Sequence, residues 1–361
     1  MKIVHIITRF NVGGTATWLT NLSNSLINSG NESFLLAGHV LKDEIEDANL
    51  LEINGIRIRS LRQSISPFPA FLSFLQIRRC IKVLNPDLVN THTSIAGVIG
   101  RIACLSLLKK RPTIVHTVHG HLLTGYFKSR KRAIVIGVER ILGRYSDLIL
   151  FSGERVRSEF VNATKISPSK TALVSPGLAF PSSIPTKSRQ KGKVIVGWLG
   201  RFVPVKDPAL AVEVARIMPN IEFKFGGDGP LLEECKKYAP SNCSFIGWTS
   251  PDHFWQGCNI ALLTSKNEAQ PISIIEAGLL KIPAVITPAG SAIEVVSDRV
   301  TGLVVEPDVR ELSKAISELL GNRKLLKSLG QNAQLSYKIK YSLEKQLADH
   351  ITAYKYAISL R

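Results

Sequence analysis

Short apolar segments alternate with helical segments along the chain, and this alternation occurs twice within its 361 residues. The apolar segments have the length and composition of strands buried on both faces, and the segments between them have helical spacing. Strands are predicted at 2–8, 33–37, 56–60, 87–90, 113–118, 147–151, 194–200, 221–225, 244–246, 260–263, 284–287 and 303–305. Helices are predicted at 68–83, 95–108, 131–144, 208–218, 230–238, 309–329 and 342–358, with one more after Gly14. Such a pattern predicts an α/β protein in which helices cover both faces of parallel sheets.

The pattern stops at 181–193, where Pro, Ser and charged residues dominate, and then begins again. A segment of this composition is typical of a linker. A chain of this length also suits two domains better than one. We therefore predict two doubly wound, Rossmann-like domains at 1–185 and 193–340, followed by a final helical segment at 341–361.

The net charge is +18 and is unevenly distributed, with +14 in residues 1–190 and +4 in residues 191–361. A basic half would attract nucleic acid, anionic lipid or a phosphorylated substrate. The sequence holds no nucleic-acid recognition motif, so we expect no nucleic-acid partner. The other two partners remain open at this point.

The five cysteines are scattered and form no Cys-x-x-Cys pair, which predicts neither a disulfide framework nor a zinc site and fits a reducing compartment. The first ten residues read as a strand and not as a signal peptide. No uncharged apolar run reaches the ~18 residues that a membrane span needs.

Two carboxylates, Glu268 and Glu276, stand eight positions apart around a strand-to-helix junction. Pro271 fits the first turn of a helix, where its missing N–H costs nothing. Glu268 is then on the preceding loop, and Glu276 is about one and a half turns inside the helix. A loop that leads into a helix N-terminus offers free amides to an anion, and nearby carboxylates can accept hydrogen bonds from sugar hydroxyls. This combination suits a nucleotide sugar.

This stretch resembles the Glu-x7-Glu motif of retaining glycosyltransferases of family 4. The resemblance implies that Glu268 contacts the donor sugar and that Glu276 holds the ribose of the nucleotide. Where the family commonly has Glu-Gly, this chain has Glu268-Ala269. The family also implies the GT-B architecture, with an acceptor domain first, a nucleotide-sugar domain second, a cleft between them and a final helix that returns to the first domain.

Two cationic residues, Arg201 and Lys206, follow the strand at 194–200. Arg offers phosphate a bidentate fork and Lys offers it a point charge. In the family these positions hold the diphosphate of the donor. The loop after the first strand is predicted to touch either that diphosphate, through Gly14, or the acceptor.

Glycines at two loops complete the predicted donor site. Gly13 and Gly14 follow the first strand, where glycine lets backbone amides approach a ligand closely. Thr15 is predicted to cap the helix that follows. Gly227 belongs to a turn that resembles the family's nucleotide loop, and Asp228 within it is a candidate helix cap. Ser273 and Ile274 are predicted to line the donor pocket as well.

Three histidines, His116, His119 and His121, lie within six residues at the end of the strand at 113–118. Metal binding is one interpretation, but no acid or cysteine lies nearby in the sequence to complete a site. The segment resembles the family pattern His-Thr-x-His-Gly-His, which implies that His119 contacts the donor sugar near the reacting centre. His92 is a candidate acceptor-side residue.

The resemblance thus predicts a retaining glycosyltransferase, hexosyl or N-acetylhexosaminyl, that acts in surface-polysaccharide synthesis without metal or cofactor. The donor is a nucleoside diphosphate sugar, preferably a UDP-sugar, and the acceptor is a glycan or a lipid-linked sugar. A sugar-nucleotide epimerase and a non-catalytic sugar-nucleotide-binding protein remain alternatives. We expect a cytoplasmic enzyme, peripheral on the inner face of the membrane, because basic clusters in the N-terminal half could bind anionic lipid. The basic residues of these clusters are Arg78, Arg79, Lys109, Lys110, Arg111, Lys128, Arg130, Lys131 and Arg132. Beside the first two of them, Phe68, Phe71, Phe74 and Leu75 suggest a helix with an apolar face and a basic end.

Overall fold

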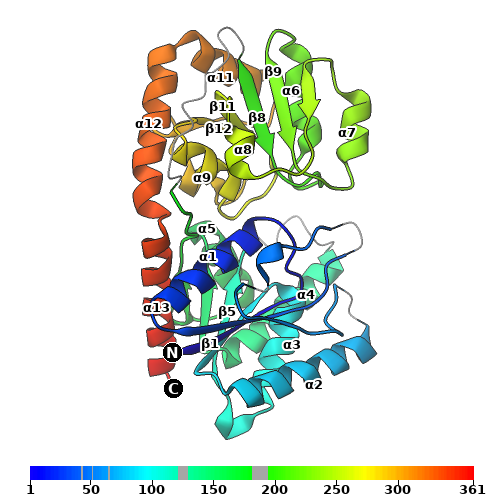
Figure 1. Cartoon of the computed structure of the whole chain (residues 1–361), viewed down its shortest axis with the longest axis vertical. Helices are drawn as coiled ribbons and strands as arrows, with labels where there is room; N and C mark the ends of the chain where they lie inside the picture. The colour runs from blue at the N-terminus through cyan, green and yellow to red at the C-terminus, as the bar shows by residue number, and fades with distance from the viewer. Residues whose placement is uncertain (42–43, 51, 64–65, 121–128, 181–193) are drawn as a thin grey trace. The chain divides into compact units, whose positions relative to one another are not determined.

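The computed structural model describes residues 1–41, 44–50, 52–63, 66–120, 129–180 and 194–361 (Figure 1). The chain divides into two compact units. The first comprises Met1–Leu178 with Leu343–Arg361, and the second comprises Ala179–Ser342. The predicted linker at 181–193 lies outside the described residues.

The first unit is built on a seven-stranded parallel sheet in the order β3-β2-β1-β4-β5-β6-β7. Its strands are β1 (Lys2–Ile7), β2 (Glu32–Ala37), β3 (Gly55–Arg57), β4 (Leu88–His92), β5 (Thr113–Val118), β6 (Leu148–Phe151) and β7 (Thr171–Leu173). The strand order reverses between β1 and β4, which pair in parallel. In open parallel sheets, ligands bind at the carboxyl ends of the strands beside such a reversal.

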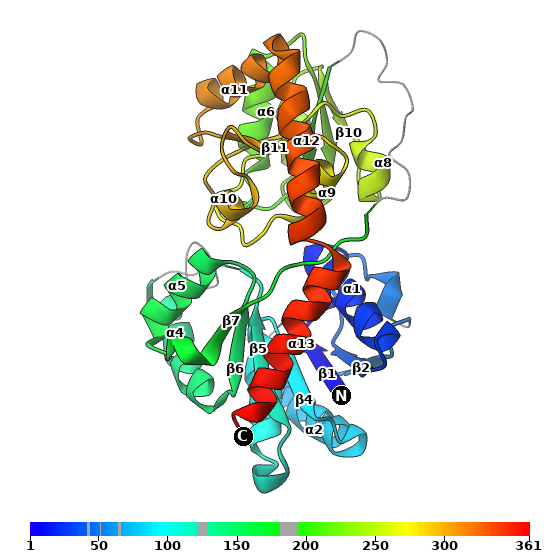
Figure 2. The same ribbon diagram turned by 90° about the vertical axis from the view of Figure 1, so that its left-hand side faces the viewer.

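Helices cover both faces of this sheet, as the continuous apolar strands require. Two of them, α1 (Gly14–Asn28) and α13 (Leu343–Ser359), pack together on one face (Figure 2). The other face is covered by α2 (Pro67–Leu84) and α3 (Ser94–Leu105). Farther along the sheet lie α4 (Ser129–Tyr145) and α5 (Glu154–Thr164). The chain returns from the second unit at Ser342, so α13 is the predicted crossover helix, and its Tyr354 accepts a hydrogen bond from buried Asn90 of β4 at 2.9 Å.

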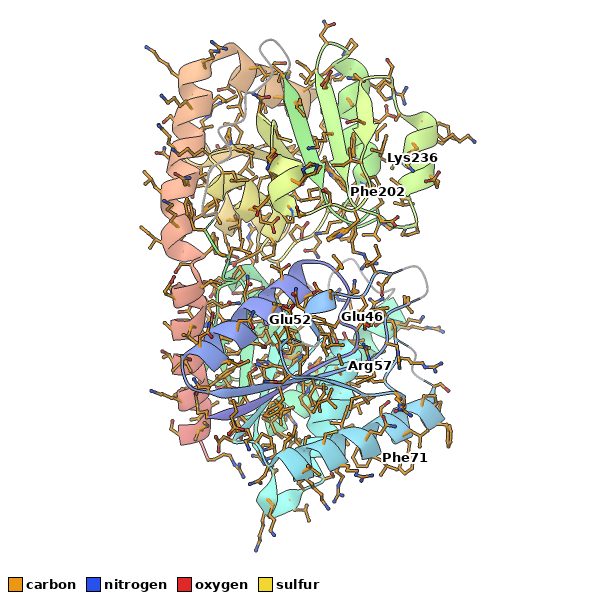
Figure 3. All side chains as sticks on the ribbon, viewed as in Figure 1. Glu46, Glu52, Arg57, Phe71, Phe202 and Lys236 are labelled. Atoms are coloured by element: carbon orange, nitrogen blue, oxygen red, sulfur yellow. The ribbon has the colours of Figure 1, made fainter. Side chains whose placement is uncertain are left out.

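The second unit has a six-stranded parallel sheet in the order β10-β9-β8-β11-β12-β13. Its strands are β8 (Ile195–Leu199), β9 (Glu222–Gly226), β10 (Cys243–Phe245), β11 (Ile260–Leu263), β12 (Ala284–Ile286) and β13 (Gly302–Val304). Its helices are α6 (Pro208–Ile217), α7 (Leu232–Tyr238), α8 (Pro251–Trp255), α9 (Ile272–Leu279), α10 (Ala292–Val295), α11 (Val309–Gly321) and α12 (Arg323–Lys340). Aromatic side chains such as Phe202, labelled in Figure 3, fill its core together with Trp198 and Phe225. The strand order reverses here between β8 and β11.

The two sheets confirm the predicted α/β class and the doubly wound order, while several local predictions were wrong. The single helix predicted at 309–329 is two helices, because Asn322 ends α11 and its side chain caps α12 by accepting from Leu325 N at 3.0 Å. Thr15 caps nothing, since α1 begins at Gly14 and Gly13 is its N-cap. The elements α5, β7, α8 and α10 were not predicted at all.

Candidate active site

The loops that follow β8 and β11 meet at the reversal of strand order in the second unit. Buried Thr264 holds them together, because its hydroxyl accepts a hydrogen bond from Trp198 Nε1 at 3.0 Å and donates one to the carbonyl of Asp207 at 2.8 Å. A backbone hydrogen bond from Lys266 N to Val205 O, at 2.8 Å, joins the same two loops. The adjacent strands and these bonds therefore fix the backbone on which Lys206 and Glu268 stand.

Lys206 and Glu268 form an ion pair between these loops. The distance from Lys206 Nζ to Glu268 Oε1 is 2.5 Å, and Ser265 Oγ donates to the same carboxylate oxygen at 2.6 Å. The Glu268 side chain is 8% exposed and that of Lys206 is 29% exposed. One charged group is thus held almost inside the protein while its partner still reaches solvent.

Helix α9 begins at Ile272, shortly after the Glu268-Ala269 pair, and Pro271 is its N-cap. The amide of Ile274 donates to Pro271 O at 3.1 Å, and the side chain of Ile274 is buried. Within the described residues, the amides of Ile272 and Ser273 donate to no protein acceptor. Amides at a helix start carry partial positive charge, so these two could receive an anion.

Glu276 is the fifth residue of α9, as the sequence predicted, and it is half-buried. The pKa of this carboxyl is raised from 4.5 to about 8, mainly by burial and to a lesser extent by the nearby charge of Asp252, while the indole of Trp255 opposes the rise. At neutral pH the group is therefore mostly protonated. A protonated carboxyl both donates and accepts hydrogen bonds, which matches the two roles that a ribose hydroxyl can play.

The glycine turn after β9 packs directly on the loop after β8. Gly227 has φ +117°, and a Cβ added there would lie 2.0 Å from the carbonyl oxygen of Gly200. Arg201, which follows Gly200, is exposed on this loop. Asp228 does not cap α7; instead its carboxylate accepts from the amide of Gly229 at 2.7 Å, so that prediction was wrong.

The first unit carries the other predicted site residues. Gly13 has φ +148° and would place an added Cβ in open space, and Gly14 is the first residue of α1. Both lie after β1, at the reversal of strand order. His119 follows β5, two strands away in the sheet.

The histidines of the motif do not converge on one point. His116 lies on the α3 face of the sheet, where its Nδ1 is 2.9 Å from Thr91 Oγ1. His119 lies on the α1 face, with its ring 4.1 Å from that of Trp18 and its Nε2 2.7 Å from Nδ1 of His92. His121 lies outside the described residues. The prediction that His92 faces an acceptor was wrong, because its side chain is 1% exposed and both ring nitrogens have partners.

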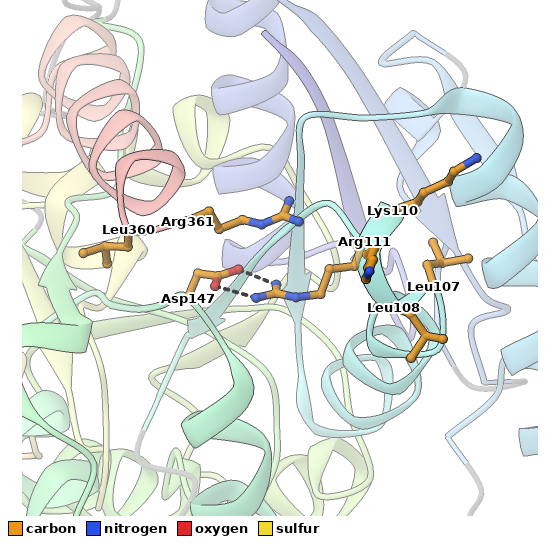
Figure 4. Close-up of a pocket in the computed structure, with 8 residues that line it drawn as sticks. Leu107, Leu108, Lys110, Arg111, Asp147, Leu360 and Arg361 are labelled. Carbon is orange, nitrogen blue, oxygen red and sulfur yellow. Dashed lines mark hydrogen bonds and ion pairs between the residues drawn. The ribbon is translucent and has the colours of Figure 1, made fainter.

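A separate pocket lies at the amino-terminal ends of the strands of the first sheet, where β5 and β6 begin (Figure 4). Its lining includes Arg111, which donates to both carboxylate oxygens of Asp147 at 2.7 and 2.9 Å. This pairing neutralises the most buried cation of the pocket. None of the predicted site residues lines it.

Metal-ligand clusters and membrane-spanning helices are both absent from the described residues. No group of three or more His, Cys, Asp or Glu side chains there is placed to hold a metal ion. No helix there is long and apolar enough to cross a membrane.

Two parallel-sheet units with a returning terminal helix define the GT-B class. The family model described as "Glycosyltransferase Family 4" matches residues 12–179, and the one described as "Glycosyl transferases group 1" matches residues 181–336. The chain therefore belongs to family 4 of the GT-B glycosyltransferases, in the branch of surface-polysaccharide synthesis.

Individual relatives agree with this assignment. The chain is 25% identical to the O-antigen biosynthesis glycosyltransferase WbnH of Escherichia coli, over 83% of this chain and 85% of the relative. It is 20% identical to UDP-Gal:alpha-D-GlcNAc-diphosphoundecaprenol alpha-1,3-galactosyltransferase of Escherichia coli, over 74% of this chain and 73% of the relative. Among solved structures, HepE from Anabaena in complex with UDP and glucose has a TM-score of 0.79 at 18% identity, covering 98% of this chain and 99% of HepE.

Proposed function

We propose that this glycosyltransferase is a retaining enzyme that moves a hexose or N-acetylhexosamine from a UDP-sugar to a hydroxyl of a lipid-linked or glycan acceptor. The donor is supported by HepE, a protein of the same fold that binds UDP and also UDP-glucose. The acceptor is supported by the Escherichia coli relative, whose name specifies a sugar on diphosphoundecaprenol.

The observation that carries this proposal is the Lys206–Glu268 pair beside the start of α9. When the bond from sugar to diphosphate breaks, negative charge develops on the leaving diphosphate. Lys206, Arg201 and the free amides of α9 stabilise that charge, which is the interaction that most lowers the barrier to such a reaction. Glu268 accepts hydrogen bonds from the donor sugar, and Glu276 binds the ribose.

The remaining predicted residues complete the donor site. Gly14 offers its backbone amide to the diphosphate, and Gly13, where an added Cβ would meet nothing within 4 Å, leaves room for the ligand. Gly227, Ser273 and Ile274 line the nucleotide and sugar, Ile274 through its backbone. His119 binds a hydroxyl of the donor sugar and orients the sugar carbon for attack.

The test has a binding step and a transfer step, both in excess EDTA. A thermal-shift screen of nucleotide sugars should give the largest rise in melting temperature with a UDP-sugar, because a ligand that binds the folded state stabilises it. Lys206→Ala should then lower transfer by about 10²–10³. The matched control is Lys236→Ala on α7 (Figure 3), which removes an exposed ion pair with Glu233 and should leave transfer unchanged.

Three outcomes would contradict the proposal. Normal transfer by Lys206→Ala would remove the role of the pair. Conversion of the donor to an isomer without acceptor would indicate an epimerase instead. Loss of activity in EDTA that returns with Mg²⁺ or Mn²⁺ would show that phosphate is bound through a metal.

We also propose that the first unit binds the anionic inner surface of the membrane through α2 and α4. On α2, Phe68 is 70%, Phe71 56% and Leu75 44% exposed. On α4, Ile134 is 67% and Ile141 58% exposed. Phe74 does not belong to this face, because it packs against the core. Exposed basic residues flank the apolar ones: Arg79, Arg130, Lys131, Arg132, Arg140 and Arg144.

Apolar side chains among cations favour insertion at an anionic interface, and each cation near such a surface contributes about 1 kcal/mol. The full-length protein should therefore sediment with anionic vesicles at low salt, less at high salt, and little with neutral vesicles. Phe71→Ser should weaken this binding, whereas Leu335→Ser, at an exposed position of α12, should not. Equal binding to both vesicle types would contradict the membrane proposal and would leave the proposed transfer reaction unaffected.

A further inference from the structure

Three histidines form a continuous chain across neighbouring strands of the first sheet. His5 lies on β1, His92 ends β4 and His119 follows β5. The distance from His5 Nδ1 to His92 Nε2 is 3.1 Å, and that from His92 Nδ1 to His119 Nε2 is 2.7 Å. His92 thus forms hydrogen bonds through both ring nitrogens. Of the three histidines, only His119, at one end of this histidine chain, is partly exposed.

Each contact between two ring nitrogens needs one hydrogen, which fixes the tautomers of all three rings together. All three rings are neutral near pH 7, since burial lowers the pKa of His5 and of His119 to about 3 and that of His92 well below its ordinary 6.5. If His92 carries its hydrogen on Nδ1, it donates to His119 and accepts from His5. If it carries the hydrogen on Nε2, both bonds reverse. All three rings therefore carry their hydrogen on the same nitrogen, which is Nδ1 in the first state and Nε2 in the second.

His5, at the buried end of the histidine chain, determines which of these two tautomeric states is favoured. Nε2 of His5 is buried and has no hydrogen-bond partner among the described residues. In the Nε2–H state this atom would be a buried, unpaired N–H, whereas in the Nδ1–H state it is only an unused acceptor. Unpaired buried N–H groups are the rarer and costlier of the two. The structure therefore favours hydrogen on Nδ1 of all three rings.

We infer that His5 and His92 are positioning residues that hold His119 as its Nδ1–H tautomer. Nε2 of His119 is already an acceptor from His92, so Nδ1–H is the group that it can offer to a substrate. On the proposed function, this makes His119 a hydrogen-bond donor to a hydroxyl oxygen of the donor sugar.

The surroundings of His119 keep this arrangement fixed. The edge-to-face contact with Trp18 restrains the ring, and His350, whose ring also lies against Trp18, donates its own Nδ1–H to Gln346 O at 2.8 Å. His350 also lowers the pKa of His5 and His119, because a second positive charge in this cluster is unfavourable. Among the described residues, no carboxylate opposes the lowering of the pKa of His5 or of His119.

The test is nitrogen-15 NMR of the full chain with labelled histidine, because the ring-nitrogen shifts distinguish the two tautomers. His119 is assigned by its loss in His119→Gln. In the wild type His119 should be a single Nδ1–H tautomer. His92→Asn keeps an amide donor near the position of Nδ1 and should preserve it, whereas His92→Leu should give a mixture. His116→Asn, on the opposite face of the sheet, is the control and should leave the His119 signal unchanged.

Transfer assays then connect the chain to catalysis. His92→Leu should lower kcat/KM about tenfold, His92→Asn should restore most of it, and UDP alone should bind both variants like the wild type. A wild-type His119 found as Nε2–H would overturn the inference, as would a single Nδ1–H tautomer in His92→Leu. If His92→Leu does not fold, the wild type and His92→Asn still decide the tautomer. Since the NMR experiment needs no substrate, failure of the proposed function would leave its result intact.

Discussion

Glu276→Gln gives a direct test of the environment that the structure assigns to this acid. Its folded-state pKa is about 8, above the ordinary 4.5. A raised pKa means that the folded protein retains a proton which the unfolded chain releases. The resulting stabilisation is fully present below about pH 4.5 and is lost as the pH rises to about 8. Glutamine does not titrate, so the variant lacks this dependence.

The size of the effect follows from the shift. At about 1.36 kcal/mol per pKa unit, the full shift corresponds to at most about 5 kcal/mol. Because the side chain is only half-buried, solvent screening reduces this, and we expect about 2 kcal/mol. The free energy of unfolding of the wild type, minus that of Glu276→Gln, should therefore fall by about 2 kcal/mol between pH 5 and pH 8.

The assay is urea unfolding followed by tryptophan fluorescence in a Trp18→Phe background. The three remaining tryptophans, Trp198, Trp248 and Trp255, then all report on the second unit. Glu234→Gln, at an exposed position of α7, is the matched control and should show no such trend.

Buried histidines act in the opposite direction but cancel in this comparison. The pKa of His5 is lowered to about 3 and that of His350 to about 4. The stability that they contribute is present above about pH 6.5 and is lost as the pH falls. Wild type and variant share these groups. A difference in free energy between the two proteins that stays constant from pH 5 to pH 8 would refute the assigned environment of Glu276.

Two further predictions concern stability. Arg101→Met should destabilise the first unit by about 3–5 kcal/mol in urea unfolding, because it leaves the buried carboxylate of Glu139, which Arg101 binds at 2.8 Å, without its partner. Adding Glu139→Leu should recover most of the lost stability, and no recovery would contradict this explanation. Gly227→Ala should lower the free energy of unfolding by about 2 kcal/mol or more, because its Cβ would lie 2.0 Å from the carbonyl oxygen of Gly200. Gly247→Ala, with φ +67° and nothing within 4 Å of the added Cβ, should lower it by only about 1 kcal/mol. Equal losses would show that the turn at Gly227 can relax.

Local sequence signals were sufficient to place Glu268 and Glu276 around the start of α9. Pro271 indicated where α9 begins, and the spacing then placed Glu268 before the helix and Glu276 inside it. The alternation of strands and helices predicted the two parallel sheets, because buried strands and amphipathic helices differ in periodicity. Signals of this kind depend on neighbours in the sequence and can be read without knowing which strands pair.

Contacts between distant segments could not be predicted in this way. The histidine chain depends on the pairing of β1 with β4 and of β4 with β5, which no local pattern specifies. His5 was therefore passed over as an ordinary strand residue, and His92 was assigned to the acceptor. The break at Asn322 was missed for a different reason, since helical spacing continues across it and only the capping hydrogen bond reveals the new helix.

Substitution of Lys206 changes more than one interaction, because its ammonium group is also paired with Glu268. Lysine has three donors, and the structure uses one of them for Glu268. On the proposed function, Lys206→Ala therefore has two effects: it removes a donor to the diphosphate, and it leaves a nearly buried carboxylate beside the diphosphate. Both effects should weaken UDP binding, the second by repulsion. Lys206→Ala/Glu268→Gln should consequently bind UDP more tightly than Lys206→Ala alone, as isothermal titration of the three proteins would measure. A double variant that binds no better than the single one would mean that the two side chains act independently on the nucleotide.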